Sequence, residues 1–189
     1  MPNGKKMVVP VVLGTARPGR ASEKVARFVL EELQSLGGVD ASLVDVRDFL
    51  FGRTTDSGEA GERPERWRSV ARGADGFIFV SPEYNHGYPG ELKILLDSAY
   101  DEYLHKPAAI CAVSAGGFGG ARMAEQLRLV LLEVGLVPIH STVYFPRVSK
   151  IFGPDGHITD NSFNERLAEM FKEFLWYARV LRAGRQDLG

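Results

Sequence analysis

Five short apolar runs alternate along the chain with longer segments whose apolar residues have helical spacing. The runs are continuous, as in Phe77-Ile78-Phe79-Val80, which is typical of strands buried on both faces of a parallel sheet. We expect strands at Met7–Leu13, Ala41–Val46, Gly76–Ser81, Ala108–Ser114 and Val137–Tyr144. We expect helices at Ser22–Leu36, Pro64–Arg72, Gly90–Leu104, Gly120–Val134 and Phe163–Arg182.

This alternation predicts an α/β fold, a doubly wound five-stranded parallel sheet with helices on both faces. Right-handed crossovers favour the strand order 2-1-3-4-5. The loops after the first, third and fourth strands then lie side by side at the carboxyl edge of the sheet, where a ligand is expected. The length of 189 residues suits a single domain spanning residues 1–189.

Two segments depart from a regular pattern. Pro10 falls within the central first strand, where its missing amide hydrogen requires a bulge or a gap on one side. The connection 47–63 is long and rich in glycine and charge, which predicts either a lid over the site or a disordered excursion.

Charge and cysteine content exclude several classes of function. Twenty-three basic and 24 acidic residues give a net charge of -1, without the excess of positive charge typical of nucleic-acid binding. The single cysteine, Cys111, rules out an internal disulfide or a multi-cysteine metal site and fits a reducing compartment. No histidine has ligand spacing with carboxylates, so no metal is expected. The first apolar run is too short to span a membrane, and we expect a cytoplasmic protein.

The first candidate loop has the sequence Gly-Thr-Ala-Arg-Pro-Gly-Arg-Ala-Ser over residues 14–22 and leads into a helix. Its glycines allow a tight turn, and the helix start offers free amide hydrogens. Thr15, Arg17, Arg20 and Ser22 add donors that suit a phosphate dianion. The spacing matches neither the dinucleotide nor the nucleoside-triphosphate motif, so a monophosphate is favoured. The alternative is an ordinary turn with Ser22 as the helix N-cap and two solvated arginines.

The second candidate loop follows the third strand and is dense in proline, glycine and tyrosine over residues 81–90. Its prolines stiffen the backbone, so its amides and the rings of Tyr84 and Tyr88 can face a flat ligand. Alternatively, these rings only cover the loop itself.

The third candidate loop has the sequence Ser-Ala-Gly-Gly-Phe-Gly-Gly over residues 114–120. Because its glycines have no side chains, its backbone amides can approach and bind carbonyl oxygens or a developing negative charge on a ligand. Alternatively, the glycines only make the loop flexible.

Together the three loops resemble the NAD(P)H-dependent FMN reductase family, a flavodoxin-like group that includes quinone, chromate and azo-dye reductases. The matching stretches are GTARPGRASEKVARFV, SPEYNHGYPGELKILLDSAY and SAGGFGGARMAEQLRLVLLEVG, of which the second is the most specific. The resemblance implies that Thr15, Arg17, Ser22 and Arg20 bind the FMN phosphate. It implies further that Pro82, Glu83, Tyr84 and Asn85 contact the flavin ring, mainly through backbone amides. Ser114, Gly116 and Gly117 would border its pyrimidine and ribityl side.

The implied activity is hydride transfer from NADPH or NADH to bound FMN, followed by reduction of a small acceptor such as a quinone in a ping-pong cycle. No side chain is expected to be an obligatory acid or base. The remaining alternatives are a one-electron carrier of flavodoxin type and a module that binds another phosphorylated ligand. Members of the family resemble one another in forming dimers or tetramers, and the apolar residues of Gly90–Leu104 make this segment the expected interface of a homo-oligomer.

Overall fold

The protein forms one parallel sheet of five strands in the order β2-β1-β3-β4-β5, which confirms the predicted order. The computed structural model describes residues 5–50, 52–53, 61–154 and 156–188. The strands are β1 (Met7–Leu13), β2 (Val39–Asp45), β3 (Phe77–Pro82), β4 (Lys106–Val113) and β5 (Leu136–Phe145). All residues of β3 and β4 are buried, which explains their continuous apolar sequences.

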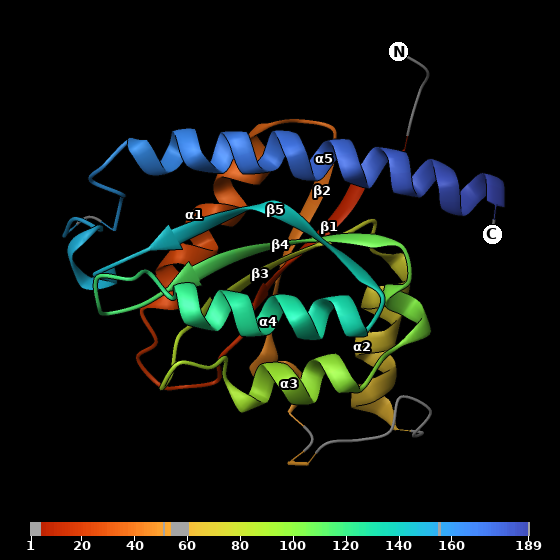
Figure 1. The fold of residues 1–189 in the computed structure, drawn as a ribbon, viewed down its shortest axis with the longest axis horizontal. Coiled ribbons are helices and arrows are strands. Elements are labelled where there is room, and N and C mark those ends of the chain that lie inside the picture. The colour runs from red at the N-terminus through yellow and green to blue at the C-terminus, as the bar shows by residue number, and fades with distance from the viewer. Residues whose placement is uncertain (1–4, 51, 54–60, 155, 189) are drawn as a thin grey trace.

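Helices cover both faces of this sheet, as Figure 1 shows. They are α1 (Ser22–Ser35), α2 (Glu62–Gly73), α3 (Gly90–Asp97), α4 (Ala121–Glu133) and α5 (Ser162–Leu188). One core packs α1 and α5 against one face of the sheet, and a second core packs α2, α3 and α4 against the other. In Figure 1 the strands β4 and β5 point toward the same side, so the loops at their carboxyl ends lie together there. None of the described helices is both long and apolar enough to cross a bilayer.

Pro10 lies inside β1. The pairing of β1 with β2 runs without interruption from Met7 to Leu13, so no bulge lies between these two strands. Pairing with β3, in contrast, begins only at Val11. The amides of Val8 and Gly14 face the β3 side, where they donate to Asp75 Oδ2 and the Val80 carbonyl. Alternate residues of a strand direct their amides to the same side, so the amide hydrogen that Pro10 lacks would have faced the β3 side. At this position β1 is not paired with β3. This confirms the gap on one side.

The helix predicted over Gly90–Leu104 is shorter in the structure. It ends at Asp97, and a separate turn of 3₁₀ helix, η2 (Asp101–Tyr103), follows. Its leucines at 92, 95 and 96 are buried in this chain's own core, so they are not available for an interface. Within the segment Gly90–Leu104, Tyr100 and Leu104 are exposed, as are Leu129 and Leu132 on α4.

The long connection after β2 begins with a turn of 3₁₀ helix, η1 (Val46–Phe49). Phe49 is buried and packs edge-on against Trp67 of α2, with ring centroids 5.8 Å apart. This start of the connection is thus part of the core. The expectation of a lid or a disordered excursion concerns mainly residues 51 and 54–60, which lie outside the described residues.

Candidate functional site

The first loop, residues 14–21, leaves the sheet beside β3 and presents unpaired donors at the start of α1. The Gly14 amide still donates to the Val80 carbonyl at 2.9 Å. Beyond it, the amides of Ala21 and Ser22 make no hydrogen bond to any described residue. The Ser22 hydroxyl is also buried without a partner among them. Because a helix N-terminus carries partial positive charge, this arrangement fits an anion.

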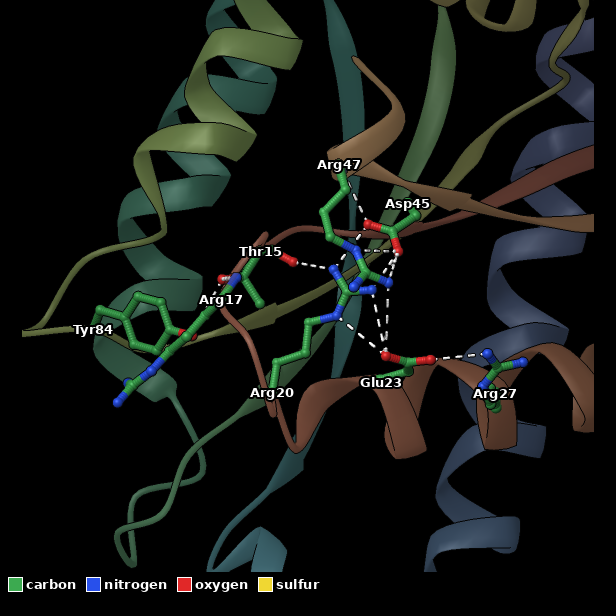
Figure 2. A network of polar contacts seen from close by, with 8 residues as sticks. All are labelled: Thr15, Arg17, Arg20, Glu23, Arg27, Asp45, Arg47 and Tyr84. Atoms are coloured by element: carbon green, nitrogen blue, oxygen red, sulfur yellow. Dashed lines mark hydrogen bonds and ion pairs between the residues drawn. The ribbon is translucent and has the colours of Figure 1, made fainter. Parts of the chain in front are cut away.

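The two arginines of the first loop have different surroundings. Arg17 is exposed, and its guanidinium carbon lies 5.4 Å from the centroid of the Tyr84 ring. Arg20 is buried, and its guanidinium binds Asp45, Glu23 and the Thr15 carbonyl, as Figure 2 shows. Since these bonds engage all three of its nitrogens, the prediction that Arg20 donates directly to a phosphate does not fit. The sequence pattern of the loop does not reveal this difference.

The second loop, residues 83–89, turns tightly at its centre. Tyr84 and Gly87 exchange two backbone hydrogen bonds of 2.9 and 3.0 Å. Asn85 and His86 between them have φ angles of +50° and +72°, as a two-residue turn of this kind requires. The Glu83 amide donates to the Val113 carbonyl, so the amides of Glu83 and Tyr84 are both used within the protein. The amide of Asn85 has no partner among the described residues.

The carboxylate of Glu83 joins the second loop to α4. It accepts a hydrogen bond from the Met123 amide at 3.3 Å and lies 2.6 Å from the Arg122 guanidinium. Burial alone would raise the pKa of Glu83, but the hydrogen bonds from Arg122 and Met123 outweigh it and hold the pKa below its ordinary value. Glu83 therefore remains ionised at neutral pH and anchors the loop.

The third loop, residues 114–120, is held from the side of β5. The Gly116 carbonyl accepts hydrogen bonds from the Ser114 hydroxyl at 2.9 Å and the Arg147 amide at 3.0 Å. A Cβ on Gly119 would lie 2.8 Å from the Cβ of Tyr144, and the φ of Gly119 is +65°, so this position requires glycine. Gly116 differs, because a Cβ there would meet no atom within 4 Å. The amides of Gly116 and Gly117 have no partner among the described residues and are open to a ligand.

The three loops are connected to one another. The Thr15 hydroxyl lies 3.2 Å from the Tyr84 hydroxyl, which joins the first loop to the second. Glu83 joins the second loop to the helix that follows the third. A hollow of about 620 Å³ opens on the second loop and is lined by Arg17, Glu83, Tyr84, Asn85, Tyr88, Pro89, Gly90 and Glu91. The expected juxtaposition of the three loops is thus present at the carboxyl edge of the sheet.

Comparison with known families matches residues 7–150 to the family described as NADPH-dependent FMN reductase. This range contains the three loops. The chain belongs to the NADPH-dependent FMN reductase family.

Individual members of the family resemble this chain over most of its length. An NAD(P)H-dependent FMN reductase of Schizosaccharomyces pombe is 33% identical over 183 residues, which cover 92% of this chain and 90% of that protein. A quinone reductase of Pseudomonas putida is 30% identical over 162 residues, 82% of this chain and 86% of that protein. Among solved structures, the flavoenzyme FerB of Paracoccus denitrificans, an NAD(P)H:(acceptor) oxidoreductase, superposes with a TM-score of 0.78 at 26% identity and covers 92% of this chain and 97% of that one.

Membership of the FMN reductase family makes this chain an NAD(P)H-dependent oxidoreductase that acts with FMN. This activity differs from that of a one-electron carrier and from that of a binding module without flavin chemistry. The fold is flavodoxin-like, as the resemblance implied.

Three polar residues at the site of this FMN reductase were not foreseen: Asp45, Arg122 and Arg147. Arg147 follows β5 in the left-handed region, with φ +47°, and its Nη2 would lie 3.4 Å from a Cβ on Gly117. Of these three residues, only Asp45 could have been predicted from the sequence as part of the site. The order 2-1-3-4-5 places the end of β2 beside the first loop, so an acidic residue there could have been paired with an arginine of that loop.

Proposed function

We propose that the three loops hold FMN as a resident cofactor, with the phosphate at the first loop and the flavin ring between the second and third. The observation that carries this proposal is a set of donors without partners among the described residues, on three loops that contact one another at the carboxyl edge of the sheet. They are the amides of Ala21, Ser22, Asn85, Gly116 and Gly117 and the hydroxyl of Ser22. The Ser22 hydroxyl is buried, and a buried donor without a protein partner is uncommon, so a phosphate there would satisfy it. The amides of Ala21, Asn85, Gly116 and Gly117 belong to exposed residues and are therefore free to bind a ligand.

The phosphate end is assigned to Thr15, Arg17 and Ser22. Arg17 supplies an exposed positive charge, and the start of α1 supplies the amides. Arg20 is not included as a direct ligand, because its guanidinium already binds Asp45 and the Thr15 carbonyl.

The ring end is assigned to the backbone of the second and third loops. Asn85 offers an amide, Pro82 and Tyr84 shape the second loop, and Glu83 fixes it through Arg122. Ser114 orders the third loop through the Gly116 carbonyl. The amides of Gly116 and Gly117 would donate to the pyrimidine edge of the flavin, which gains negative charge on reduction. When bound, FMN supplies the hydride and electron transfer chemistry, so the chain needs only to bind and orient.

We infer that NADPH or NADH and the acceptor, a quinone or a similar small molecule, use the same open side of the site in turn. The protein then needs no acid or base of its own. Steady-state kinetics with NADPH and a quinone should give parallel double-reciprocal lines, as a ping-pong cycle requires. Intersecting lines would contradict alternating use of one site.

Visible absorption of the purified protein tests whether FMN is a resident cofactor. A yellow protein that is bleached by NADPH or NADH without oxygen, and that regains its colour on addition of a quinone, is the expected result. A colourless protein that does not retain added FMN would contradict the proposal and would make FMN a freely exchanging substrate.

A homo-oligomer is also proposed, with the interface moved from α3 to the exposed face of α4. Leu129 and Leu132 are 69% and 64% exposed and lie one helical turn apart, so together they offer an apolar contact to a second chain. Sedimentation of the Leu129→Lys/Leu132→Lys variant should show a smaller species than the parent chain. An unchanged sedimentation coefficient would remove α4 from the interface.

A cytoplasmic location is proposed because Cys111, a free and buried thiol, fits a reducing compartment. Cell fractionation with detection of the chain tests it, and recovery outside the cytoplasmic fraction would contradict it.

A further inference from the structure

The guanidinium of Arg20 lies beneath the first loop, where each of its nitrogens donates a hydrogen bond. The side chain is only 2% exposed. Nη1 and Nη2 donate to the two carboxylate oxygens of Asp45, the first at 2.8 Å, and Nε reaches Glu23 at 3.4 Å. Figure 2 shows this paired arrangement, which is the geometry in which an arginine binds a carboxylate most specifically.

The same guanidinium also holds the backbone of the first loop. Nη1 donates to the Thr15 carbonyl oxygen, so the side chain of Arg20 closes the turn that begins at Thr15. The carbonyl of Thr15 is thereby fixed toward Asp45. The Thr15 hydroxyl and the side chain of Arg17 lie on the other side, next to Tyr84 (Figure 2).

Asp45 is well placed to serve as the fixed end of this arrangement. It is the last residue of β2 and pairs with Leu13, so it belongs to the sheet rather than to the loop. Burial would raise the pKa of Asp45, but the hydrogen bonds from Arg20 and Arg47 outweigh it and keep the carboxylate ionised. The negative charge of Asp45 compensates the buried charge of Arg20.

We propose that Arg20 and Asp45 are positioning residues, which preform the first loop so that the Thr15 hydroxyl, Arg17 and the start of α1 face the FMN phosphate. The pair acts through Thr15 and does not touch the ligand. This inference rests on the proposed FMN site and assigns to it a residue, Asp45, that lies outside all three loops. A preformed loop loses less conformational freedom on binding, which strengthens binding of the phosphate group in particular.

The test compares the dissociation constants of FMN and riboflavin, because riboflavin has the same ring but no phosphate. Two variants are used with the parent chain. Arg20→Lys keeps the charge but cannot bond both Asp45 and the Thr15 carbonyl in a planar fork. The double variant Arg20→Met/Asp45→Asn leaves no unpaired buried charge, so it is expected to fold. Arg27→Gln is the control, since Arg27 is exposed and reaches the network only through Glu23.

In both test variants the preference for FMN over riboflavin should fall by about 10- to 100-fold, the range known for residues that orient metal ligands. Riboflavin affinity should stay close to that of the parent chain, and Arg27→Gln should keep the full preference. A general loss of structure would weaken both flavins alike, and thermal denaturation identifies such a case.

One result would contradict the positioning role of Arg20 and Asp45, and a different result would contradict the proposed phosphate site. Folded variants that keep the parent preference for FMN, or that weaken both flavins equally, would overturn the positioning role alone. A parent chain that binds FMN no better than riboflavin would overturn the proposed phosphate site itself.

Discussion

The hydroxyl oxygens of Thr15 and Tyr84 lie 3.2 Å apart, although 69 residues separate them in the chain. One belongs to the loop after β1 and the other to the loop after β3, so this contact joins the proposed phosphate end of the site to its ring end. Thr15 is completely buried, and its hydroxyl also accepts a hydrogen bond from the Arg17 amide at 3.3 Å. This pair therefore links the two loops, together with the contact of the Arg17 guanidinium with the Tyr84 ring.

Tyr84→Phe should weaken FMN binding by about 0.5–1.5 kcal/mol, the usual net value of one hydrogen bond. The ring remains, but the Thr15 hydroxyl loses its partner across the loops. Fluorescence titration with FMN measures the change. Tyr100→Phe is the matched control, because Tyr100 is exposed outside the three loops and its hydroxyl makes no hydrogen bond within the described part of the chain. Equal losses in the two variants would show that the contact between the loops has no special role.

Arg17→Ala should weaken FMN binding by about 1.5–3 kcal/mol, the range for a hydrogen bond to a charged group. Stability of the folded chain should hardly change, because Arg17 is exposed. Arg66→Ala is the control. Arg66 is also an exposed arginine over an aromatic ring, 5.3 Å from the ring centroid of Phe49, but it lies on another surface. An unchanged dissociation constant for Arg17→Ala would remove this residue from the site.

Gly116→Ala should keep the stability of the fold yet weaken FMN binding by about 1–3 kcal/mol, the usual cost of an extra methyl group in a packed contact. A Cβ there meets no protein atom within 4 Å, so the new methyl group would occupy the space assigned to the ligand. Urea unfolding and FMN titration measure the two effects separately. Gly184→Ala in α5 is the control, because its Cβ is equally free of contacts. If Gly116→Ala binds FMN as tightly as the parent, the third loop does not border the flavin.

Glu83→Gln should lower the free energy of unfolding at neutral pH, and the difference from the parent should shrink in acid. The pKa of Glu83 is lowered in the folded chain relative to its ordinary value of 4.5, so the unfolded chain binds more protons as the pH falls. The stabilisation is therefore complete above about pH 4.5 and is lost as the pH falls through the lower, folded pKa. Urea unfolding over a pH series measures it.

The Arg122→Gln background provides the control for this pH dependence. Glu83→Gln should have a much smaller effect there, because the partner of the carboxylate is already absent. A difference between parent and Glu83→Gln that stays constant from neutral pH into acid would contradict the assignment of an ionised, paired Glu83.

Sequence patterns predicted the sheet well because its signals are local. Continuous apolar runs such as that of β3 identify strands buried on both faces, and even Pro10 could be reconciled with a central strand through a gap on one side. The extent of α3 was not predictable in the same way. The apolar positions continue to Leu104, but Ser98 caps the helix at its end and the backbone of Tyr100, with φ of -146°, is no longer helical. Apolar spacing shows which residues are buried, not where the backbone leaves the helix.

The candidate loops could be located from sequence, but the tasks of their side chains could not. Arg17 and Arg20 look equivalent in the loop, and only the position of Asp45 at the end of β2 separates an exposed arginine from a buried one. Glu83 is similar, since its partner Arg122 is 39 residues away. Such pairings depend on distances across the sheet edge, which a single sequence does not contain.

A crystal structure of the chain with FMN tests the account most directly. We predict that the phosphate will lie among Thr15, Arg17 and Ser22, with the flavin ring against Asn85 and Gly116 and with Arg20 still bound to Asp45. Flavin bound elsewhere, for example in the hollow lined by Leu104, His105 and Leu188, would contradict the claim that these three loops form one FMN site.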